Sequence, residues 1–337
     1  MLNQLDKANQ VDPQIALSPP QKEAVEYGDG PLLISAGAGS GKTRTLTQRL
    51  IYLIKNGVEP RRIVAITFTN KAAGEMKKRI YGELGEKILK DPQFVGTFHS
   101  FCAKILRTEA KKLGRTSSYV IFDDDDSEKI IKRVLKSVDD GTPKSPAKIE
   151  KEISRIKNNL RDEDELDAPV KEIFDAYEAE LARQNAFDFD DLIEKVVRLM
   201  EKDEAVLEKY QKMYSYVLVD EYQDINKAQY ELVKLLAGSH RNINVVGDDQ
   251  QSIYGFRWSD FTNFLNFERD WHDAKIIKLG ENYRSTGNIV MAAAGVIENN
   301  KLQRKKELWT TNDPGEPVKV VGAEDEDEEA EIIVETI

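Results

Sequence analysis

A glycine-rich stretch, AGAGSGKT, occupies residues 36–43 and could hold the phosphates of a nucleotide. It fits the phosphate-loop pattern G-x-x-x-x-G-K-[ST], except that Ala36 stands where the pattern has its first glycine. Small residues let backbone N–H groups close around phosphates, and the following helix N-terminus adds its dipole. Lys42 would reach the β and γ oxygens, and the Thr43 hydroxyl would hold Mg²⁺. A strand-to-helix turn without a ligand is the weaker alternative.

Two adjacent carboxylates follow an apolar run in YVLVDEYQD, residues 216–224. Asp220 and Glu221 come directly after four strand-forming residues, so we expect them at the end of a strand. Nucleotide hydrolysis needs one carboxylate for Mg²⁺ and another to take the proton of the attacking water. A solvated acidic turn is the alternative. The phosphate loop in the same chain favours nucleotide hydrolysis.

Aromatic residues lie beside polar residues at the ends of three predicted strands. The segments are ITFTNKAA at 66–73, GTFHSF at 96–101 and DDQQSIYGFRWSD at 248–260. Rings that stack on bases, interleaved with hydroxyls and amides, are typical of a platform for single-stranded nucleic acid. Any one of these aromatics would more often belong to the core. Three such clusters at the strand ends, where α/β sheets bind ligands, favour the nucleic-acid interpretation.

The elements that must position these residues follow from hydrophobic patterning. Continuous apolar runs predict buried strands at 31–35, 62–68, 94–98, 215–220, 242–248 and 275–280. Helical patterns separate several of them, at 42–55, 70–84 and 226–237. This alternation predicts an α/β fold with a parallel sheet covered by helices.

Two further regions depart from that alternation. Between about 118 and 213 helical spacing prevails, which predicts an inserted all-α domain. In it, the acidic run 123–126 is expected to cap a helix and 139–146 to form a turn. The last segment, from 317 onward, predicts one strand followed by an acidic helix.

Composition places the chain among globular proteins, with 337 residues and a formal net charge of −11. The charge is uneven: residues 324–335 hold eight acids and no base, whereas 96–115 hold five bases and one acid. A local basic face is therefore compatible with a nucleic-acid partner. No apolar run of 18 residues and no signal peptide is visible, so we expect a cytoplasmic protein without a membrane partner. Cys102 is predicted to be a buried helix residue.

Taken in order, eight segments resemble the N-terminal half of the superfamily 1 DNA helicases of the UvrD, PcrA and Rep family. The segments are LSPPQ, AGAGSGKT, ITFTNKAAGEM, GTFHSF, DFDDL, VDEYQD, VVGDDQQSIYGFRWSD and ENYRS, and they span roughly 17 to 300. The resemblance implies a RecA-like P-loop domain with an inserted helical domain. It also implies 3′-to-5′ translocation on single-stranded DNA, driven by hydrolysis of ATP with Mg²⁺.

This resemblance predicts four parts of the chain and a set of partners. The RecA-like domain would comprise 1–117 and 214–283, the helical insertion 118–213, and the start of a second, truncated RecA-like domain 284–337. The expected partners are single-stranded or 3′-tailed duplex DNA, and repair or replication-restart proteins.

The resemblance further implies roles for individual residues. The ATP-binding residues would be Gln21 at the adenine edge, Ala36, Gly37, Ala38, Gly39, Ser40, Gly41, Lys42, Thr43, Arg44, and Tyr283 stacked on adenine. The catalytic residues would be Lys42, Asp220, the general base Glu221, and Gln251, Arg257 and Arg284 near the γ-phosphate. Thr43 and Asp220 would hold the metal. The DNA-binding residues would be Phe68, Thr69, Asn70, Thr97, His99, Phe189, Tyr254 and Phe256.

The sequence departs from the family pattern in two respects. Trp258 occupies a position where the family commonly has glycine, so the geometry just after Arg257 differs from expectation. The family also continues into a complete second RecA-like domain, with an arginine that reaches the ATP site across the cleft. Two alternatives stay open: a non-catalytic module that binds ATP or DNA and needs a separate C-terminal half, or the helicase subunit of a helicase–nuclease, which shares these motifs.

Overall fold

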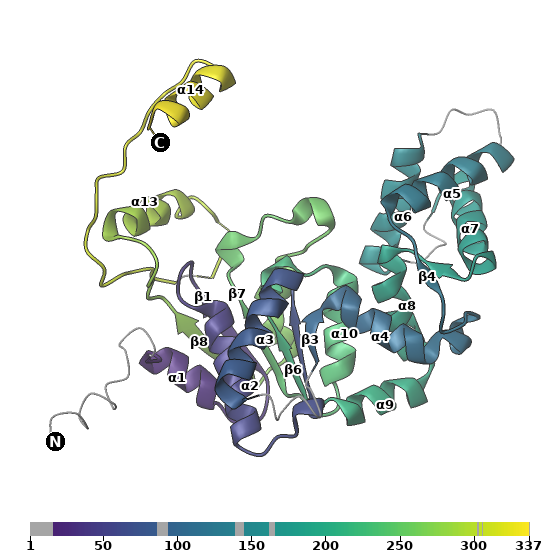
Figure 1. The fold of residues 1–337 in the computed structure, drawn as a ribbon, viewed down its shortest axis with the longest axis horizontal. Coiled ribbons are helices and arrows are strands. Elements are labelled where there is room, and N and C mark those ends of the chain that lie inside the picture. The colour runs from purple at the N-terminus through teal and green to yellow at the C-terminus, as the bar shows by residue number, and fades with distance from the viewer. Residues whose placement is uncertain are drawn as a thin grey trace.

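A six-stranded, all-parallel sheet forms the centre of the computed structural model (Figure 1), with strand order β3-β2-β6-β7-β1-β8. The structure describes residues 16–85, 94–138, 145–161, 166–301, 303–304 and 306–336, and of Arg257 only the backbone. The strands are β1 (Leu32–Ala36), β2 (Ile63–Thr67), β3 (Phe94–Thr97), β6 (Tyr216–Val219), β7 (Ile243–Gly247) and β8 (Lys275–Leu279). All six predicted strands are confirmed.

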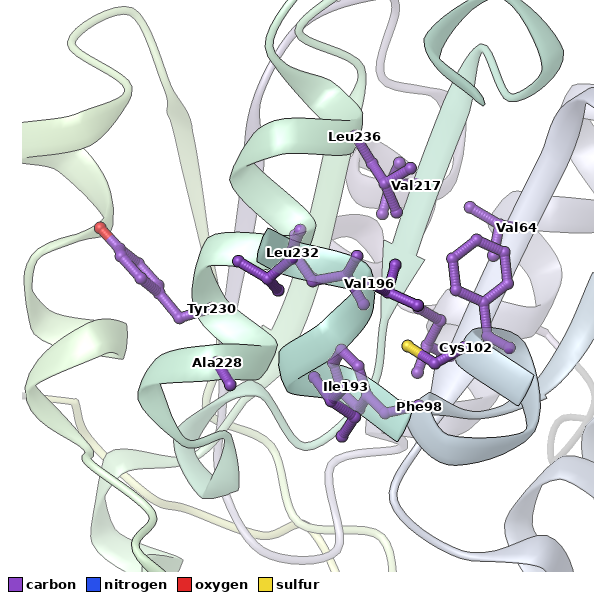
Figure 2. Close-up of a cluster of buried hydrophobic side chains, with 14 of the residues drawn as sticks. Val64, Phe98, Cys102, Ile193, Val196, Val217, Ala228, Tyr230, Leu232 and Leu236 are labelled. Carbon is purple, nitrogen blue, oxygen red and sulfur yellow. The ribbon is translucent and has the colours of Figure 1, made fainter. Parts of the chain in front are cut away.

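Helices cover both faces of the sheet, as the continuous apolar strands require. One face carries α1 (Pro19–Glu26), α2 (Lys42–Lys55) and α3 (Asn70–Leu84). The other carries α4 (Phe98–Glu109), α8 (Phe189–Lys202), α9 (Glu204–Met213) and α10 (Lys227–Ala237). Successive strand residues alternate between the two cores: Val64 packs with the second group and Ala65 with the first. Figure 2 shows this second core, where Cys102 is buried as predicted.

The helical insertion lies beside the sheet, at the right of Figure 1. Its helices α5 (Asp124–Ser137), α6 (Pro146–Asn159) and α7 (Ala168–Arg183) have a separate core. The Asp123 carboxylate caps α5 by accepting the N–H of Asp126, which confirms the predicted cap. Within the predicted turn, residues 139–144 lie outside the described part of the chain.

The insertion and the sheet share the segment around α8. Although α8 and α9 fall inside the predicted range 118–213, their apolar faces join the core of the sheet. The two short strands β4 (Val120–Ile121) and β5 (Ala186–Phe187) pair in parallel at the junction. The predicted domain bounds stay a prediction, and the packing assigns a core of their own to α5, α6 and α7.

The remaining elements are short or lie near the end of the chain. They are η1 (Pro60–Arg62), η3 (Ala110–Leu113), η5 (Tyr222–Asp224), η6 (Asp249–Gln251), η7 (Gly255–Arg257), α11 (Thr262–Leu265), α12 (Phe267–Asp270), α13 (Gly287–Ile297) and α14 (Glu326–Thr336). The acidic helix predicted near the end is α14. The strand predicted after residue 317 is wrong: 317–323 is irregular and exposed, and no described strand pairs with it. Among the described helices, none has the length and apolar character that crossing a membrane requires.

The parallel arrangement brings the predicted site residues to one edge. Because the carboxyl ends of parallel strands meet at the same edge, the segments that follow β1, β2, β3, β6 and β7 lie together there. These segments carry the glycine-rich loop, the three aromatic clusters and the paired acids. The fold is therefore the RecA-like α/β arrangement that the resemblance implies.

Candidate active site

The glycine-rich loop joins β1 to α2 and passes through two left-handed residues. Gly39 and Gly41 have φ angles of 68° and 83°. A Cβ atom would lie 2.7 Å from the Asn282 side chain at Gly39, and 3.0 Å from the Gln21 amide at Gly41. Gln21 Nε2 also donates to the Ser40 carbonyl at 2.9 Å. Backbone conformation and space therefore both require glycine at these two positions.

The first residues of the loop explain the departure from the pattern. Ala36 is the last residue of β1 and is buried, so an alanine is accommodated there. Gly37 has no room for a side chain, because a Cβ atom there would lie 2.1 Å from Leu308 Cδ2. The Ala38 carbonyl accepts a 2.8 Å hydrogen bond from Asn282 Nδ2, so the turn after β8 is tied to the loop.

Thr43 and Asp220 meet at the point where the resemblance implies a metal. The Thr43 hydroxyl donates to Asp220 Oδ2 at 2.8 Å. Burial, and after it the charge of Glu221, raises the pKa of the Asp220 carboxyl to about 6. A buried carboxylate beside a hydroxyl is a donor pair that suits Mg²⁺, which prefers oxygen ligands. These residues fit the predicted metal.

Lys42 lies between the two groups that would act on the terminal phosphate. Its ammonium donates to Gln251 Oε1 at 3.1 Å and lies 3.6 Å from Glu221 Oε2. Glu221 has a left-handed backbone, with φ of 51° and ψ of 47°. Such a conformation is costly for a residue other than glycine and is often found at functional sites. Here it places a half-exposed carboxylate beside Lys42.

Gln223 is a residue of this site that the sequence interpretation missed. Its buried amide donates to Glu221 Oε2 at 3.0 Å and to Asp224 Oδ2 at 2.9 Å. Its side-chain oxygen, Oε1, accepts a hydrogen bond from the backbone N–H of Asp248 at 2.9 Å. Gln223 therefore holds the general-base candidate and ties the end of β6 to the end of β7. Its position within VDEYQD could have indicated this role.

Three residues that were expected to lie near the adenine or the phosphates, Tyr283, Arg44 and Arg284, lie close to the glycine-rich loop or to α1. The N–H of Tyr283 donates to the Gly39 carbonyl at 3.0 Å, and its ring is 46% exposed. Arg44 donates to the Ala16 carbonyl at 3.4 Å, next to α1. Arg284 is exposed, and its Cβ would lie 3.0 Å from a Cβ atom added at Gly39. The side chain of Arg257 lies outside the described residues, so its role stays a prediction.

Arg49 is a second residue that the sequence interpretation missed. It is fully buried and donates to the carbonyls of Tyr27 and Gly28, at 2.6 and 2.9 Å, at the C-terminus of α1. Burial lowers the pKa of its guanidinium to about 10. Since α1 also carries Gln21, Arg49 fixes one end of the helix whose other end contacts the phosphate loop.

The eight residues expected to bind DNA gather along one surface. Phe68 lies 4.8 Å from Tyr254, whose ring is 5.9 Å from Phe256, and His99 lies 5.5 Å from Phe189, all as ring centroids. A hollow of about 400 Å³ is lined by Phe68, Thr69, Asn70, Thr97, His99 and Phe189 among others. A larger hollow of about 800 Å³ extends to Phe256 and to the helical insertion. Exposed rings of this kind can stack on bases.

His99 differs from the exposed rings around it. Burial lowers the pKa of its imidazole to about 4, so the ring is neutral at physiological pH. Thr97 caps α4 through its hydroxyl, and Thr69 caps α3 in the same way. Two of the polar residues at the surface are thus fixed by the helices that they start.

Trp258 occupies a conformation that glycine normally takes. Its φ of 63° lies in the left-handed region, which agrees with the glycine that is common in the family. Its indole N–H donates to the Ser154 hydroxyl on α6 at 3.2 Å. Trp258, in place of the usual glycine, therefore forms a contact between the loop after β7 and the helical insertion.

The chain is similar to known protein families and to curated proteins. The family model described as the UvrD/REP helicase N-terminal domain matches residues 17–272, and the UvrD-like helicase C-terminal domain matches 277–337. The ATP-dependent DNA helicase PcrA of Staphylococcus epidermidis is 45% identical over 94% of this chain and 45% of its own length. The PcrA of Staphylococcus aureus is 45% identical over 94% of this chain and 44% of its own length. The chain spans less than half the length of these curated relatives.

Proposed function

The chain belongs to the UvrD/REP helicase family, and from that premise we propose that it supplies the ATP-hydrolysing and single-stranded-DNA-binding half of a 3′-to-5′ DNA helicase. The observation that carries the proposal is the meeting of Lys42, Glu221 and Gln251 beside the Thr43–Asp220 pair. These groups match the positions that phosphoryl transfer requires around a terminal phosphate.

In the proposed mechanism, the loop and the N-terminus of α2 bind the phosphates, and Lys42 neutralises the charge that develops on them. Thr43 and Asp220 would hold Mg²⁺, which supplies charge neutralisation of the phosphates when bound. Glu221, whose carboxylate is held in place by Gln223, would accept the proton of the attacking water. Tyr283 and Gln21 would bind the adenine.

The DNA-binding half of the proposal rests on the aromatic surface. Phe256 and Phe189 are 72% and 47% exposed, which is unusual for large aromatic rings in this molecule. Tyr254 connects this surface to the nucleotide side, since it follows Gln251 by three residues and contacts Phe68. ATP binding at Gln251 could thereby change the surface that holds DNA. Repair or replication-restart proteins and 3′-tailed DNA are the partners that we propose for the whole enzyme.

The experiment is a measurement of ATPase activity at low salt, with and without single-stranded DNA, on the chain and on Glu221→Gln. We expect hydrolysis that rises with DNA and falls at least about 100-fold in the variant, the size of effect that general-base loss produces. Binding of ATP without hydrolysis would instead favour the non-catalytic module. A chain that binds no ATP would contradict the proposal.

A further inference from the structure

Residues 303–304 and 306–310 lie against the phosphate site, although they come after β8 in the chain. Leu308 fills the space in front of Gly37, and Trp309 exchanges backbone hydrogen bonds with Gly280 and Asn282, of 3.1 and 2.7 Å. This segment falls within the part of the chain matched by the C-terminal family model. It therefore connects that part to the nucleotide-binding loop.

Lys306, in the middle of this segment, is buried against two carboxylates. Its side chain is 1% exposed, and those of Asp248 and Asp249 are 2% and 0% exposed. The ammonium contacts Asp248 and lies 2.9 Å from Asp249 Oδ1. Asp249 also accepts the backbone N–H of Arg304. Removing the cation would leave two buried carboxylates without their charge partner, which is strongly unfavourable.

A continuous chain of hydrogen bonds runs from Lys306 to the phosphate loop. Asp248 Oδ1 contacts Lys306, and Asp248 Oδ2 accepts from Gln251 Nε2. The carbonyl of the same amide, Gln251 Oε1, accepts from Lys42 Nζ at 3.1 Å. The Gln251 amide cannot turn over, because its carbonyl would then face a carboxylate. Asp248 thus sets which end of the amide Lys42 contacts.

We propose that Lys306 is a positioning residue of the phosphate site, which acts through Asp248 and Gln251 on the Lys42 ammonium. In this arrangement residues 303–304 and 306–310 hold Gln251 ready for the terminal phosphate. Displacement of the segment would release Asp248 and loosen the amide. The inference rests on the proposed ATP-dependent function and assigns to Lys306 a part in distinguishing ATP from ADP.

The test is the affinity of the full chain for fluorescent mant-ATP and mant-ADP in the presence of Mg²⁺. We expect Lys306→Met to weaken mant-ATP binding about tenfold, the loss that corresponds to one charge-assisted contact, and mant-ADP binding less than about threefold. Lys306→Arg, which keeps the charge, should restore most of the difference. Lys301→Met is the matched control, because Lys301 is exposed in the preceding turn, and it should leave both affinities unchanged.

A double variant separates this role from a general loss of stability. If Lys306 acts through Gln251, then adding Lys306→Met to Gln251→Ala should weaken mant-ATP binding little further, whereas independent effects would add. Additive effects, or equal weakening of both nucleotides, would overturn the inference. If Lys306→Met does not fold, Lys306→Gln, which also removes the charge, takes its place. A Lys306→Gln chain with the parent's ratio of affinities would also overturn it.

The outcome for the parent chain distinguishes the two proposals. Because the inference depends on ATP binding, a parent chain that binds neither nucleotide would contradict both. A parent chain that binds ATP, with an unchanged ATP-to-ADP ratio in Lys306→Met, would contradict the role of Lys306 alone.

Discussion

The Trp258 indole N–H donates to the Ser154 hydroxyl at 3.2 Å, which joins the loop after β7 to α6 of the helical insertion. A second contact runs in parallel: Asn226 donates to Asn158 Oδ1 at 2.5 Å, and Asn158 donates to Asp190 Oδ1 at 2.8 Å. The residues of both contacts line the larger hollow together with Phe189. They connect the segments that follow β6 and β7 to the surface proposed for DNA.

Replacing Trp258 should therefore weaken DNA binding more than ATP binding. Trp258→Gly removes the hydrogen bond and relieves the left-handed backbone, so we expect the stability to change little. Loss of one hydrogen bond of about 1 kcal/mol should reduce the affinity for a fluorescein-labelled oligo-dT about fivefold. ATP affinity should stay within about twofold.

The complementary variant Ser154→Ala removes the acceptor and leaves the indole ring in place. We expect the same direction of effect, and in the double variant less than the sum of the two losses. Fluorescence anisotropy with the oligo-dT measures all three. Full additivity would show that the two side chains act on DNA binding independently.

His99 should make the stability depend on pH. Its pKa is lowered by burial to about 4, below the value of 6.5 that it has when exposed. As the pH falls, the unfolded chain therefore binds this proton at a higher pH than the folded chain does. Stability should be highest above pH 6.5 and fall as the pH drops from 6.5 towards 4, by up to about 3 kcal/mol from this group. Urea unfolding at pH 7.5 and 5 measures the change, and His99→Gln should reduce it. An equal pH dependence in both proteins would refute the assignment.

Much of the fold could be predicted because local patterns determine it. Runs such as LLIS and YVLV are buried on both faces, so their hydrophobicity alone identifies strands. The valines after residue 317 gave the same pattern and no strand, because a strand also needs a neighbour with which to pair. Short-range chemistry, such as the Asp123 cap, was likewise visible in the sequence.

The site was only partly predictable, since several of its residues act through contacts between distant segments. Gln223 contacts Glu221 directly. Its link to the end of β7, and the link from Lys306 to Gln251, both pass through Asp248, which no spacing rule connects to Gln223 or Lys306. Arg49 falls within the predicted helix 42–55, and its partners are carbonyls at the end of α1, which carry no sequence pattern. Such contacts become visible only when the sheet order is known.

Arg49 should be essential for the position of α1. Its buried guanidinium is held by backbone carbonyls and by Asn244, and no carboxylate of the described residues forms a hydrogen bond with it. Arg49→Met would leave those carbonyls unsatisfied, so we expect a loss of about 2–4 kcal/mol of stability. Arg49→Lys should recover part of this. Thermal unfolding by circular dichroism measures it, with Arg79→Met on the exposed face of α3 as control.

The same variants test the link from Arg49 to the nucleotide. Because α1 places Gln21 against the loop, Arg49→Lys should reduce the preference for mant-ATP over mant-GTP, which Gln21 is expected to read. An unchanged preference, with lowered stability, would limit Arg49 to supporting the fold.

Finally, each exposed ring should contribute separately to DNA affinity. Stacking of a base on an aromatic side chain contributes about 1–3 kcal/mol, so Phe256→Ala and Phe189→Ala should each weaken oligo-dT binding by about 5- to 150-fold. Met291→Ala, an exposed apolar residue on α13, is the control and should have no effect. The salt dependence of binding should be the same in all variants, because no phosphate contact is removed. If the Phe256 and Phe189 variants bind oligo-dT as the parent does, the DNA surface lies elsewhere on the molecule.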